Sequence, residues 1–464
     1  MLRFFNKYYP VRGLLFFLGE SGLIYLSIWL AIHTFYSAQL NFDPEIRHIL
    51  AGILPIVFII QLSLYYHDLY NFQVKKKTFE LSIRIIQAIA VAFIGLAIIN
   101  LLFPFLILKK DIFFLGLFLL ILFLVSWRLI YQFICQHDLF NERILLVGDG
   151  NLASLIGEEI RSNLDSGYVV KAVFSNPGKT QLAAKLGAEQ YNSYEGLCEY
   201  AMANGIKKIV VALEERRGGS PWRPLLDCRM HGVKIFEGYS FCEVLSGKIL
   251  ARNTPPSWLI FSDGFRRYRM TVWSKRAADI CLASLGIIIS APLQLGVGIL
   301  VKITSPGPVF YKQSRVGQRE KTFQVIKFRT MCCDAEEQSG AVWAENKDPR
   351  ITSAGRVLRK LRLDELPQFW NVLKGEMSFV GPRPERPEFV EQLKQRLPYY
   401  GERHTVKPGI TGWAQINYGY GASEEDALRK LEYDLFYIKN LSLILDIFIV
   451  LKTVKTVLGR VGAR

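Results

Sequence analysis

The residues of this chain whose types and spacing could do chemistry are concentrated between positions 305 and 417. Two adjacent acids, Asp364 and Glu365, directly follow a stretch over 350–362 that holds five cations and no acid. The cations of this stretch are Arg350, Arg356, Arg359, Lys360 and Arg362. Arg and Lys side chains clamp phosphates, Arg through two parallel hydrogen bonds. The pattern therefore predicts a diphosphate-binding site with a carboxylate pair beside it.

The two acids could act on a phosphate in either of two ways. Because opposite charges favour the carboxylate form, we expect both acids to be ionised among so many cations. An ionised carboxylate can hold Mg²⁺ through its oxygens, or it can attack phosphorus and form an acyl phosphate. An alternative is purely structural, since residues 365–374 are typical of a helix with Gly375 as its C-cap. Asp364 would then be only an N-cap, and the residue pattern alone leaves both roles open.

Four long apolar stretches precede this region, at about 14–37, 47–66, 81–103 and 112–134. Each approaches or exceeds the ~20 residues that a membrane-crossing helix needs. Lys and Arg residues precede the first stretch and lie between the second and the third, although Lys109 and Lys110 are an exception. By the positive-inside rule, we expect the amino terminus and everything after residue 135 in the cytoplasm.

The composition agrees with a membrane protein and excludes several other classes. Half of the residues are hydrophobic and 21% are charged, which excludes a disordered chain and disfavours a purely soluble one. The net charge of +16 suits an anionic membrane face or a phosphate-rich substrate. The seven Cys form no Cys-x-x-Cys pair and the six His are dispersed. We therefore expect neither a disulfide framework, nor a zinc ribbon, nor a histidine-based metal site.

The middle of the chain has the pattern of a parallel α/β domain. A short apolar strand over 143–148 enters a glycine turn, 148–153, and then a helix that extends to about residue 163. This is the context that a dinucleotide fingerprint requires. Further strands at 168–174, 207–213 and 233–237 predict a Rossmann-like sheet. No acid follows the second strand and no Tyr-x-x-x-Lys pair occurs, which favours a scaffolding or regulatory role over cofactor binding.

A fifth apolar run, over 277–301, contains only one charged residue, Asp279. By length it would cross the membrane, but Pro292 removes a backbone hydrogen bond and bends a helix. A full crossing would also separate the middle and carboxy-terminal domains. We therefore expect a re-entrant helix over 275–303 that breaks at 290–292, with a plain span as the alternative. The run over 434–458 is typical of an interfacial amphipathic helix, with core packing as the alternative.

The strings over 305–331, 348–385 and 406–413 closely resemble the bacterial polyprenyl-phosphate sugar-1-phosphate transferases, in their large monotopic form that initiates exopolysaccharide or O-antigen synthesis. The resemblance implies a multidomain membrane protein. Its parts would be an N-terminal four-helix transmembrane bundle over 1–135, a Rossmann-like α/β middle domain over 141–262, and a C-terminal α-rich monotopic catalytic domain over 270–464. The chain departs from the family at the helix break, where it has Ala291-Pro292 in place of Ser-Pro, with Ser290 one position earlier.

The resemblance also implies an activity. The enzyme would transfer a hexose 1-phosphate from a UDP-sugar to undecaprenyl phosphate and release UMP, at the cytoplasmic face of the bacterial inner membrane. Asp364 matches the nucleophile and would contact Mg²⁺, and Glu365 matches the second acid of the pair. The substrate-binding positions would be Lys327, Arg329, Arg350 and Arg383, with Gln313 and Arg315 bordering the site. UDP-glucose and UDP-galactose are the leading donors, with N-acetylated sugars still open.

The expected partners are the UDP-sugar, undecaprenyl phosphate, membrane lipids and, by resemblance, a second copy of the chain, but no nucleic acid. Three alternatives stay open. The transfer could be a direct displacement without a covalent intermediate. The chain could be a non-catalytic scaffold for polysaccharide assembly, or a nucleotide-sugar oxidoreductase that uses its middle domain.

Overall fold

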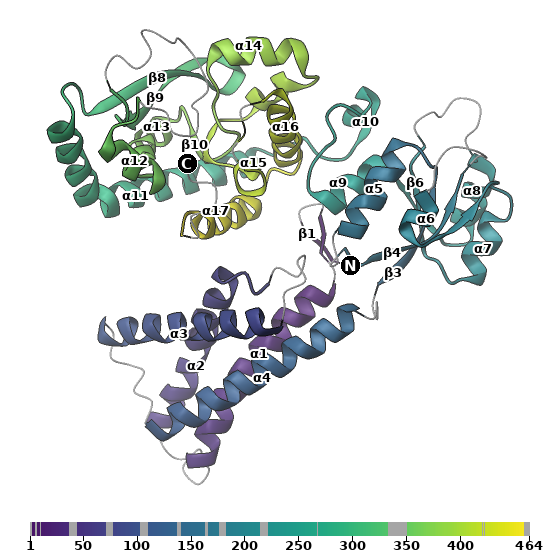
Figure 1. Cartoon of the computed structure of the whole chain (residues 1–464), viewed down its shortest axis with the longest axis horizontal. Helices are drawn as coiled ribbons and strands as arrows, with labels where there is room; N and C mark the ends of the chain where they lie inside the picture. Colours follow the sequence, from purple (N-terminus) through teal and green to yellow (C-terminus); the bar gives the residue numbers. More distant parts are fainter. Residues whose placement is uncertain are drawn as a thin grey trace. The chain divides into compact units, whose positions relative to one another are not determined.

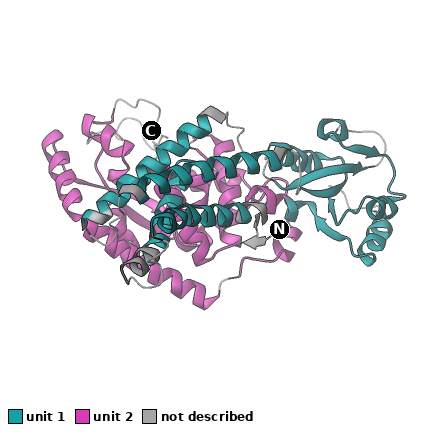
Figure 2. Cartoon of the chain, turned by 90° about the horizontal axis from the view of Figure 1, so that it is seen from below, with its two compact units in different colours: residues 1–241 teal, residues 242–464 magenta. Residues whose placement is uncertain are grey.

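The computed structural model describes residues 2–4, 7–9, 11–36, 44–70, 78–102, 110–136, 141–162, 166–175, 182–213, 221–266, 268–332, 350–419, 421 and 423–458. The chain divides into two compact units, 1–241 and 242–464 (Figure 2). A short antiparallel hairpin, β1 (Leu2–Phe4) and β2 (Lys7–Tyr9), begins the first unit.

Four apolar helices follow, as predicted: α1 (Val11–Tyr36), α2 (Pro44–Tyr66), α3 (Thr78–Leu102) and α4 (Lys110–Gln136) (Figure 1). The described parts of α1, α3 and α4 are long and apolar enough to cross a membrane, and α2 contributes a shorter apolar stretch. Ile, Leu and Ala side chains of all four helices form a shared core. Within the bundle, the buried Glu20 of α1 pairs with the buried Arg128 of α4, so each charge has a partner.

The middle domain contains a parallel five-stranded sheet in the order β5-β4-β3-β6-β7, the doubly wound order of a Rossmann-like fold. Its strands are β3 (Glu142–Val147), β4 (Tyr168–Phe174), β5 (Glu189–Tyr191), β6 (Lys208–Val211) and β7 (Lys234–Glu237). Its helices are α5 (Asn151–Ser162), α6 (Leu182–Leu186), α7 (Leu197–Ala203), α8 (Trp222–Met230) and α9 (Gly238–Ser246). All four predicted strands are present. The sequence missed β5, whose three residues are exposed and form no apolar run.

Gly148 shows why the predicted turn needs glycine. Its φ is +113°, and an added Cβ would lie 2.6 Å from the carbonyl oxygen of Ala212. The turn therefore brings β3 and the residue after β6 into close backbone contact, at the end of the sheet where α5 begins.

In the second unit, short strands and helices pack on one side of a long helix, α11 (Arg269–Thr304), much of whose apolar surface is exposed. It contains α10 (Pro256–Phe261), α11 (Arg269–Thr304), β8 (Phe310–Val316), η1 (Gln318–Glu320), β9 (Thr322–Phe328), α12 (Ser353–Lys360), η2 (Leu363–Glu365), α13 (Gln368–Lys374), β10 (Ser378–Val380), α14 (Pro387–Arg396), η3 (Tyr400–Thr405), β11 (Gly409–Thr411), α15 (Trp413–Asn417), α16 (Glu424–Lys439) and α17 (Leu443–Leu458). Strands β8 and β9 form an antiparallel hairpin, and β10 pairs with β11 in parallel.

Helix α11 differs in part from its prediction. The helix is continuous through Pro292, whereas a break at 290–292 was predicted. Figure 1 shows that the helix bends, so that its two parts run in different directions. Proline causes such bends because it removes a backbone hydrogen bond. Ala283 in the first part packs against Val372 and Met377, whereas Val297 and Val301 near the end pack against Phe328 and Leu358. Both parts of the helix therefore contact the same unit.

The predicted amphipathic helix over 434–458 is wrong as one element. Helix α16 ends at Lys439 and α17 begins at Leu443, so residues 434–439 form the buried end of α16. Core packing, the alternative, holds for that stretch, where Lys439 donates to Glu243 at 2.6 Å. Helix α17 has an exposed apolar face, formed by Ile444, Ile447, Leu451 and Val454.

The segment that follows α9 packs on the carboxy-terminal helices. The Trp413 indole donates to the carbonyl oxygen of Gly247 at 2.8 Å, and the Ile249 amide donates to that of Glu432 at 3.0 Å. The division between the compact units thus falls inside the stretch assigned to the middle domain, 141–262. The domain limits from the sequence stay a prediction.

Candidate active site

Asp364 and Glu365 lie in η2, a short turn that connects α12 to α13. The turn follows Arg362, whose backbone is left-handed with φ +54°. Helix α13 has Pro367 as its N-cap and Gly375, with φ +84°, as its C-cap. The C-cap prediction is therefore confirmed, whereas the interpretation of Asp364 as an N-cap is wrong. The two acidic residues therefore lie in the turn that immediately precedes α13.

The Glu365 carboxylate forms ion pairs with three basic side chains. Its Oε1 lies 3.0 Å from Arg383 Nη2 and 3.3 Å from Lys327 Nζ, and its Oε2 lies 3.8 Å from Arg362 Nη1. Burial opposes ionisation of this side chain, but the three cations hold the pKa of Glu365 well below its usual range. Glu365 is therefore ionised, and it gathers three basic side chains at one place.

Asp364 has a different environment, although it is the chain neighbour of Glu365. Burial and the negative charge of Glu365 raise the pKa of Asp364, against the pull of Lys327, Arg359 and Arg383. The cations therefore favour the ionised form, as expected for both acids, but at Asp364 burial and Glu365 oppose them. No described residue donates a hydrogen bond to the Asp364 carboxylate, which is only 9% exposed. A carboxylate without a protein donor can accept hydrogen bonds from a ligand or coordinate an ion.

The hairpin of β8 and β9 positions Lys327, and a buried amide fixes that hairpin to α13. The Asn371 side chain accepts from the Ile326 amide at 3.1 Å and donates to the Gln324 carbonyl oxygen at 2.7 Å. Lys327 follows Ile326 directly, so this amide sets the distance between Lys327 and the acids that precede α13. No role was predicted for Asn371, although an Asn in an apolar helical stretch is a signal for a buried hydrogen-bonding position.

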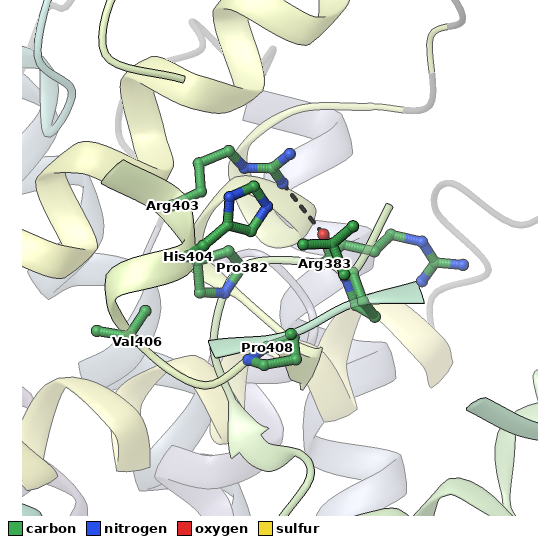
Figure 3. Close-up of a pocket in the computed structure, with 9 residues that line it drawn as sticks. Pro382, Arg383, Arg403, His404, Val406 and Pro408 are labelled. Carbon is green, nitrogen blue, oxygen red and sulfur yellow. Dashed lines mark hydrogen bonds between the residues drawn. The ribbon is translucent and has the colours of Figure 1, made fainter. Parts of the chain in front are cut away.

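Two further Arg residues hold the loop that carries Arg383. Arg315 donates to the Pro384 carbonyl oxygen at 3.2 Å and to Gln313 Oε1 at 3.1 Å. Arg403 donates to the carbonyl oxygen of Arg383 at 3.1 Å (Figure 3). Gln313 and Arg315, which were predicted to border the site, therefore lie beside the Arg383 loop. Arg403 was missed by the sequence, because its partners are distant along the chain.

The Arg403 side chain lies in a buried network next to a small pocket. Its Nε donates to Asp434 Oδ2 at 2.9 Å and its Nη1 donates to the Tyr400 hydroxyl at 2.6 Å. The pocket in Figure 3 is lined by Val316, Gly317, Pro382, Arg383, Pro384, Arg403, His404, Val406 and Pro408. Burial, together with the charge of Arg403, lowers the pKa of His404 to about 4. His404 is therefore neutral near pH 7.

The structure does not bring every predicted cation to the acids. Arg329 is buried, and its guanidinium donates to the carbonyl oxygens of Pro306 at 2.6 Å and Ser305 at 2.7 Å. It stabilises the turn after α11. Arg350 is half-buried, and its carbonyl oxygen accepts from the Cys332 amide at 3.0 Å. Of the predicted phosphate ligands, Lys327 and Arg383 are those in contact with the carboxylate pair.

Polar side chains at the start of α11 connect the long helix to this site. Asp279 accepts from the Phe379 amide at 2.8 Å and from the Ser378 hydroxyl at 3.0 Å. Arg276 donates to the carbonyl oxygens of Val372 and Leu373, at the end of α13. The apolar helix and the helix that follows the acids are thus held together. Leu363 and Leu366, which flank the acids, also pack against the cluster that contains Val297 and Val301 of α11.

Comparisons with known proteins found two families that each match a part of the chain, and several similar curated proteins. The family described as bacterial sugar transferase matches residues 270–460, and a family described as a CoA-binding domain matches residues 66–220. A UDP-N-acetylgalactosamine-undecaprenyl-phosphate N-acetylgalactosaminephosphotransferase of Aeromonas hydrophila is 42% identical over 55% of this chain and 60% of its own length. A UDP-glucose:undecaprenyl-phosphate glucose-1-phosphate transferase of Escherichia coli K12 is 34% identical over 68% of each chain. An exopolysaccharide production protein of Rhizobium leguminosarum is 40% identical over 40% of this chain and 96% of its own length.

Proposed function

Because the chain belongs to the polyprenyl-phosphate sugar-1-phosphate transferases of the bacterial sugar transferase family, we propose that it moves a hexose 1-phosphate from a UDP-sugar to undecaprenyl phosphate and releases UMP. One observation supports this most strongly. A buried carboxylate, Asp364, stands without a protein donor among the described residues, beside a carboxylate that gathers Arg383 and Lys327. Such a site presents both a nucleophile and cations for a diphosphate.

In the proposed reaction, an Asp364 carboxylate oxygen attacks the phosphorus that bears the sugar. The bond between that phosphorus and the oxygen of the UMP phosphate breaks, UMP leaves, and an acyl phosphate links Asp364 to the sugar phosphate. A phosphate oxygen of the lipid then attacks the same phosphorus, which releases the free carboxylate and forms the lipid diphosphate sugar. Glu365 keeps Lys327 and Arg383 in place, and these cations bind oxygens of the diphosphate.

The Asp364 carboxylate also fits a divalent ion, because Mg²⁺ prefers carboxylate oxygens. No hydrogen-bond donor among the described residues occupies the oxygens of this carboxylate. When bound, Mg²⁺ would neutralise negative charge on the diphosphate. The basic side chains favour the attacking, ionised form of Asp364, since Lys327, Arg359 and Arg383 all lower its pKa against burial.

The identity of the donor is tested by UMP release. The curated relatives act, by name, on UDP-glucose or on UDP-N-acetylgalactosamine, so a panel must include both, with UDP-galactose and UDP-N-acetylglucosamine. With undecaprenyl phosphate, we expect UMP from at least one donor, and none above background from Asp364→Asn. Glu365→Gln should lose most activity, whereas the same change at the exposed Glu391 of α14 should lose none. UMP release by Asp364→Asn at the wild-type rate would mean that the reaction does not use Asp364.

Direct displacement is separated from the covalent route by isotope exchange. The covalent route predicts that labelled UMP enters the UDP-sugar pool without any lipid acceptor, because the first step is reversible. Direct displacement predicts no exchange until undecaprenyl phosphate is added. Exchange that persists in Asp364→Asn would contradict Asp364 as the nucleophile.

The same proposal places α11 in the membrane as a re-entrant helix at the cytoplasmic face of the inner membrane. Its support is the exposed apolar surface, which includes Leu285, Ile288, Ile289 and Leu295, and the contacts of both helix parts with one unit. Cysteines introduced at Met270 and Thr304 test it in sealed vesicles of known orientation. Both should react only from the cytoplasmic side, and reaction of position 304 only from the opposite side would require a full crossing.

For the middle domain, we propose a scaffolding or regulatory role. Phe174 at the end of β4 stacks on Tyr191 of β5 at 4.7 Å, and the next residue is the buried Ser175, so no acid is present to hold a ribose. Equilibrium dialysis of the full chain with NAD and with coenzyme A tests this role. Tight binding of NAD would favour the oxidoreductase alternative. The homodimer stays a prediction.

A further inference from the structure

The middle domain brings together three side chains that ligate metals, although the six His are dispersed in the sequence. Cys198 lies on α7, and Asp227 and His231 lie on α8 and at its C-cap. One ligand atom from each lies within 4.8 Å of the other two. Among the described residues, this is the one group of three or more His, Cys, Asp or Glu side chains with such spacing. The tertiary fold creates the cluster, since Cys198 and His231 lie 33 positions apart in the chain. The Cys198 thiol also forms a hydrogen bond with that of Cys228, the neighbour of Asp227 on α8.

The distances match a tetrahedral zinc site. With zinc bonds of about 2.3 Å to sulfur and about 2.1 Å to nitrogen or oxygen, tetrahedral ligands lie about 3.6 Å apart for sulfur and nitrogen and about 3.4 Å apart for nitrogen and oxygen. In this structure, Cys198 Sγ lies 3.8 Å from His231 Nδ1, and His231 Nδ1 lies 3.4 Å from Asp227 Oδ1. An ion therefore needs only small side-chain shifts to contact all three atoms.

The surroundings allow an ion to enter and to be held. The Asp227 and His231 side chains are 57% and 54% exposed, whereas Cys198 is half-buried at the edge of the domain core. Thiolate, imidazole and carboxylate together suit zinc among the common divalent metals. The exposed side of the cluster leaves the fourth position to water.

Binding must displace the proton of the Cys198 thiol and the contact of His231 with the Asp227 backbone. Burial raises the pKa of the Cys198 thiol, so that thiol is protonated near pH 7 without a metal. His231 Nδ1 also lies 2.9 Å from the Asp227 carbonyl oxygen, so the ring turns away from that oxygen when Nδ1 binds an ion. Metal affinity should therefore increase with pH.

We propose that Cys198, Asp227 and His231 form a zinc site that fixes α7 to α8 in the middle domain. The site is separate from the carboxylate pair and does not depend on the transferase activity. Its effect is structural, because a metal that joins two helices stabilises their packing against the sheet.

The test uses the full chain, purified in detergent without metal and titrated with Co²⁺ and then with Zn²⁺. We expect one Co²⁺ per chain, with the charge-transfer absorption of a cobalt–thiolate bond and the visible bands of tetrahedral cobalt, and displacement of Co²⁺ by Zn²⁺. Cys198→Ser should abolish the charge-transfer band. His231→Ala should weaken zinc binding by at least about 100-fold, since even indirect partners of metal ligands contribute 10–100-fold. Affinity should increase about tenfold or more from pH 6 to pH 7.

Matched controls are Cys281→Ser and Cys332→Ser, which remove exposed thiols elsewhere and should keep the cobalt spectrum. Zinc should raise the melting temperature of the wild type but not that of Cys198→Ser. Three results would overturn the proposal: cobalt bound without a thiolate band, unchanged zinc affinity in both ligand variants, or a Cys198–Cys228 disulfide in protein purified from reducing lysate.

Discussion

Arg403→Lys is the substitution that most sharply connects the structure to the reaction. The Arg403 guanidinium is 6% exposed and donates in three directions, to Asp434, to the Tyr400 hydroxyl and to the Arg383 carbonyl oxygen. Lysine keeps the charge, but a single ammonium on a flexible stem cannot reproduce the planar fork. We expect the Asp434 contact to persist and the other two hydrogen bonds to be lost.

The magnitude follows from those two hydrogen bonds. Hydrogen bonds to charged groups contribute about 1.5–3 kcal/mol each. At the lower end of that range, the loss of two such bonds decreases the free energy of unfolding by about 3 kcal/mol. For a unit of 150–250 residues, which includes the unit over 242–464, each kcal/mol lowers the melting temperature by about 2–4 °C. The variant should therefore melt about 6–12 °C below the wild type.

The effect on activity comes through the Arg383 loop. If its carbonyl oxygen loses the Arg403 donor, the Arg383 guanidinium can shift from its position 3.0 Å from Glu365. A misplacement of about 1 Å can reduce an enzymatic rate by about 100-fold, so we expect kcat/KM for UMP release to decrease by about 10–100-fold. The assay must run well below the variant's melting temperature, where the protein stays folded.

The matched control is Arg396→Lys. Arg396 is 66% exposed and pairs with Glu424 at 3.2 Å on the surface, where such pairs contribute little. It should change the free energy of unfolding by less than about 0.5 kcal/mol and leave activity unchanged. A melting temperature of Arg403→Lys within about 2 °C of the wild type would refute the energetic reasoning. A destabilised but fully active variant would refute the link to Arg383.

Three further substitutions test separate parts of the account. His404 has a pKa of about 4 in the folded chain against a usual 6.5, so the unfolded chain binds more protons between these values and stability falls as pH drops from about 6.5 to 4. His404→Gln should flatten that part of the curve in urea titrations, and an unchanged slope would count against a buried neutral His404. Gly355→Ala places a Cβ against the Thr330 carbonyl oxygen and should destabilise by about 3 kcal/mol in thermal melts, and wild-type melting would disprove this close approach. Lys439→Met leaves the buried Glu243 without its cation and should destabilise by about 3–5 kcal/mol. Lys439→Met with Glu243→Leu should recover part of the loss, and no recovery would contradict the pairing.

The sequence predicted the elements that have strong local patterns. Apolar length identified α1 to α4, and strand, glycine turn and helix identified the parallel sheet. The prediction failed where contacts between residues distant in the chain determine where a helix ends. The break between α16 and α17 was missed although the polar residues Asn440 and Ser442 interrupt the apolar pattern there. Two separate buried ion pairs hold the helices, Lys439 with Glu243 for α16 and Asp446 with Lys275 for α17.

In the candidate site, too, residues with a local signal were predicted and residues placed by tertiary contacts were not. Asp364 and Glu365 were identified from the cations beside them in the chain. Lys327 and Arg329, two residues apart, would share one face of a strand, but β9 ends at Phe328 and Arg329 turns to the carbonyl oxygens of Ser305 and Pro306. Arg403 could not be found, because its partners Arg383 and Asp434 lie 20 and 31 residues away.

The most direct test of the central claim is the mass of the peptide that contains Asp364, measured after the enzyme meets its UDP-sugar without lipid acceptor and is quenched rapidly in acid. The account predicts that this peptide gains one hexose phosphate, that the gain disappears when undecaprenyl phosphate is added, and that Asp364→Asn never shows it. A wild-type enzyme that transfers the sugar phosphate to the lipid and releases UMP at full rate, with an unmodified Asp364 peptide at every quench time and no exchange of UMP, would contradict the covalent route.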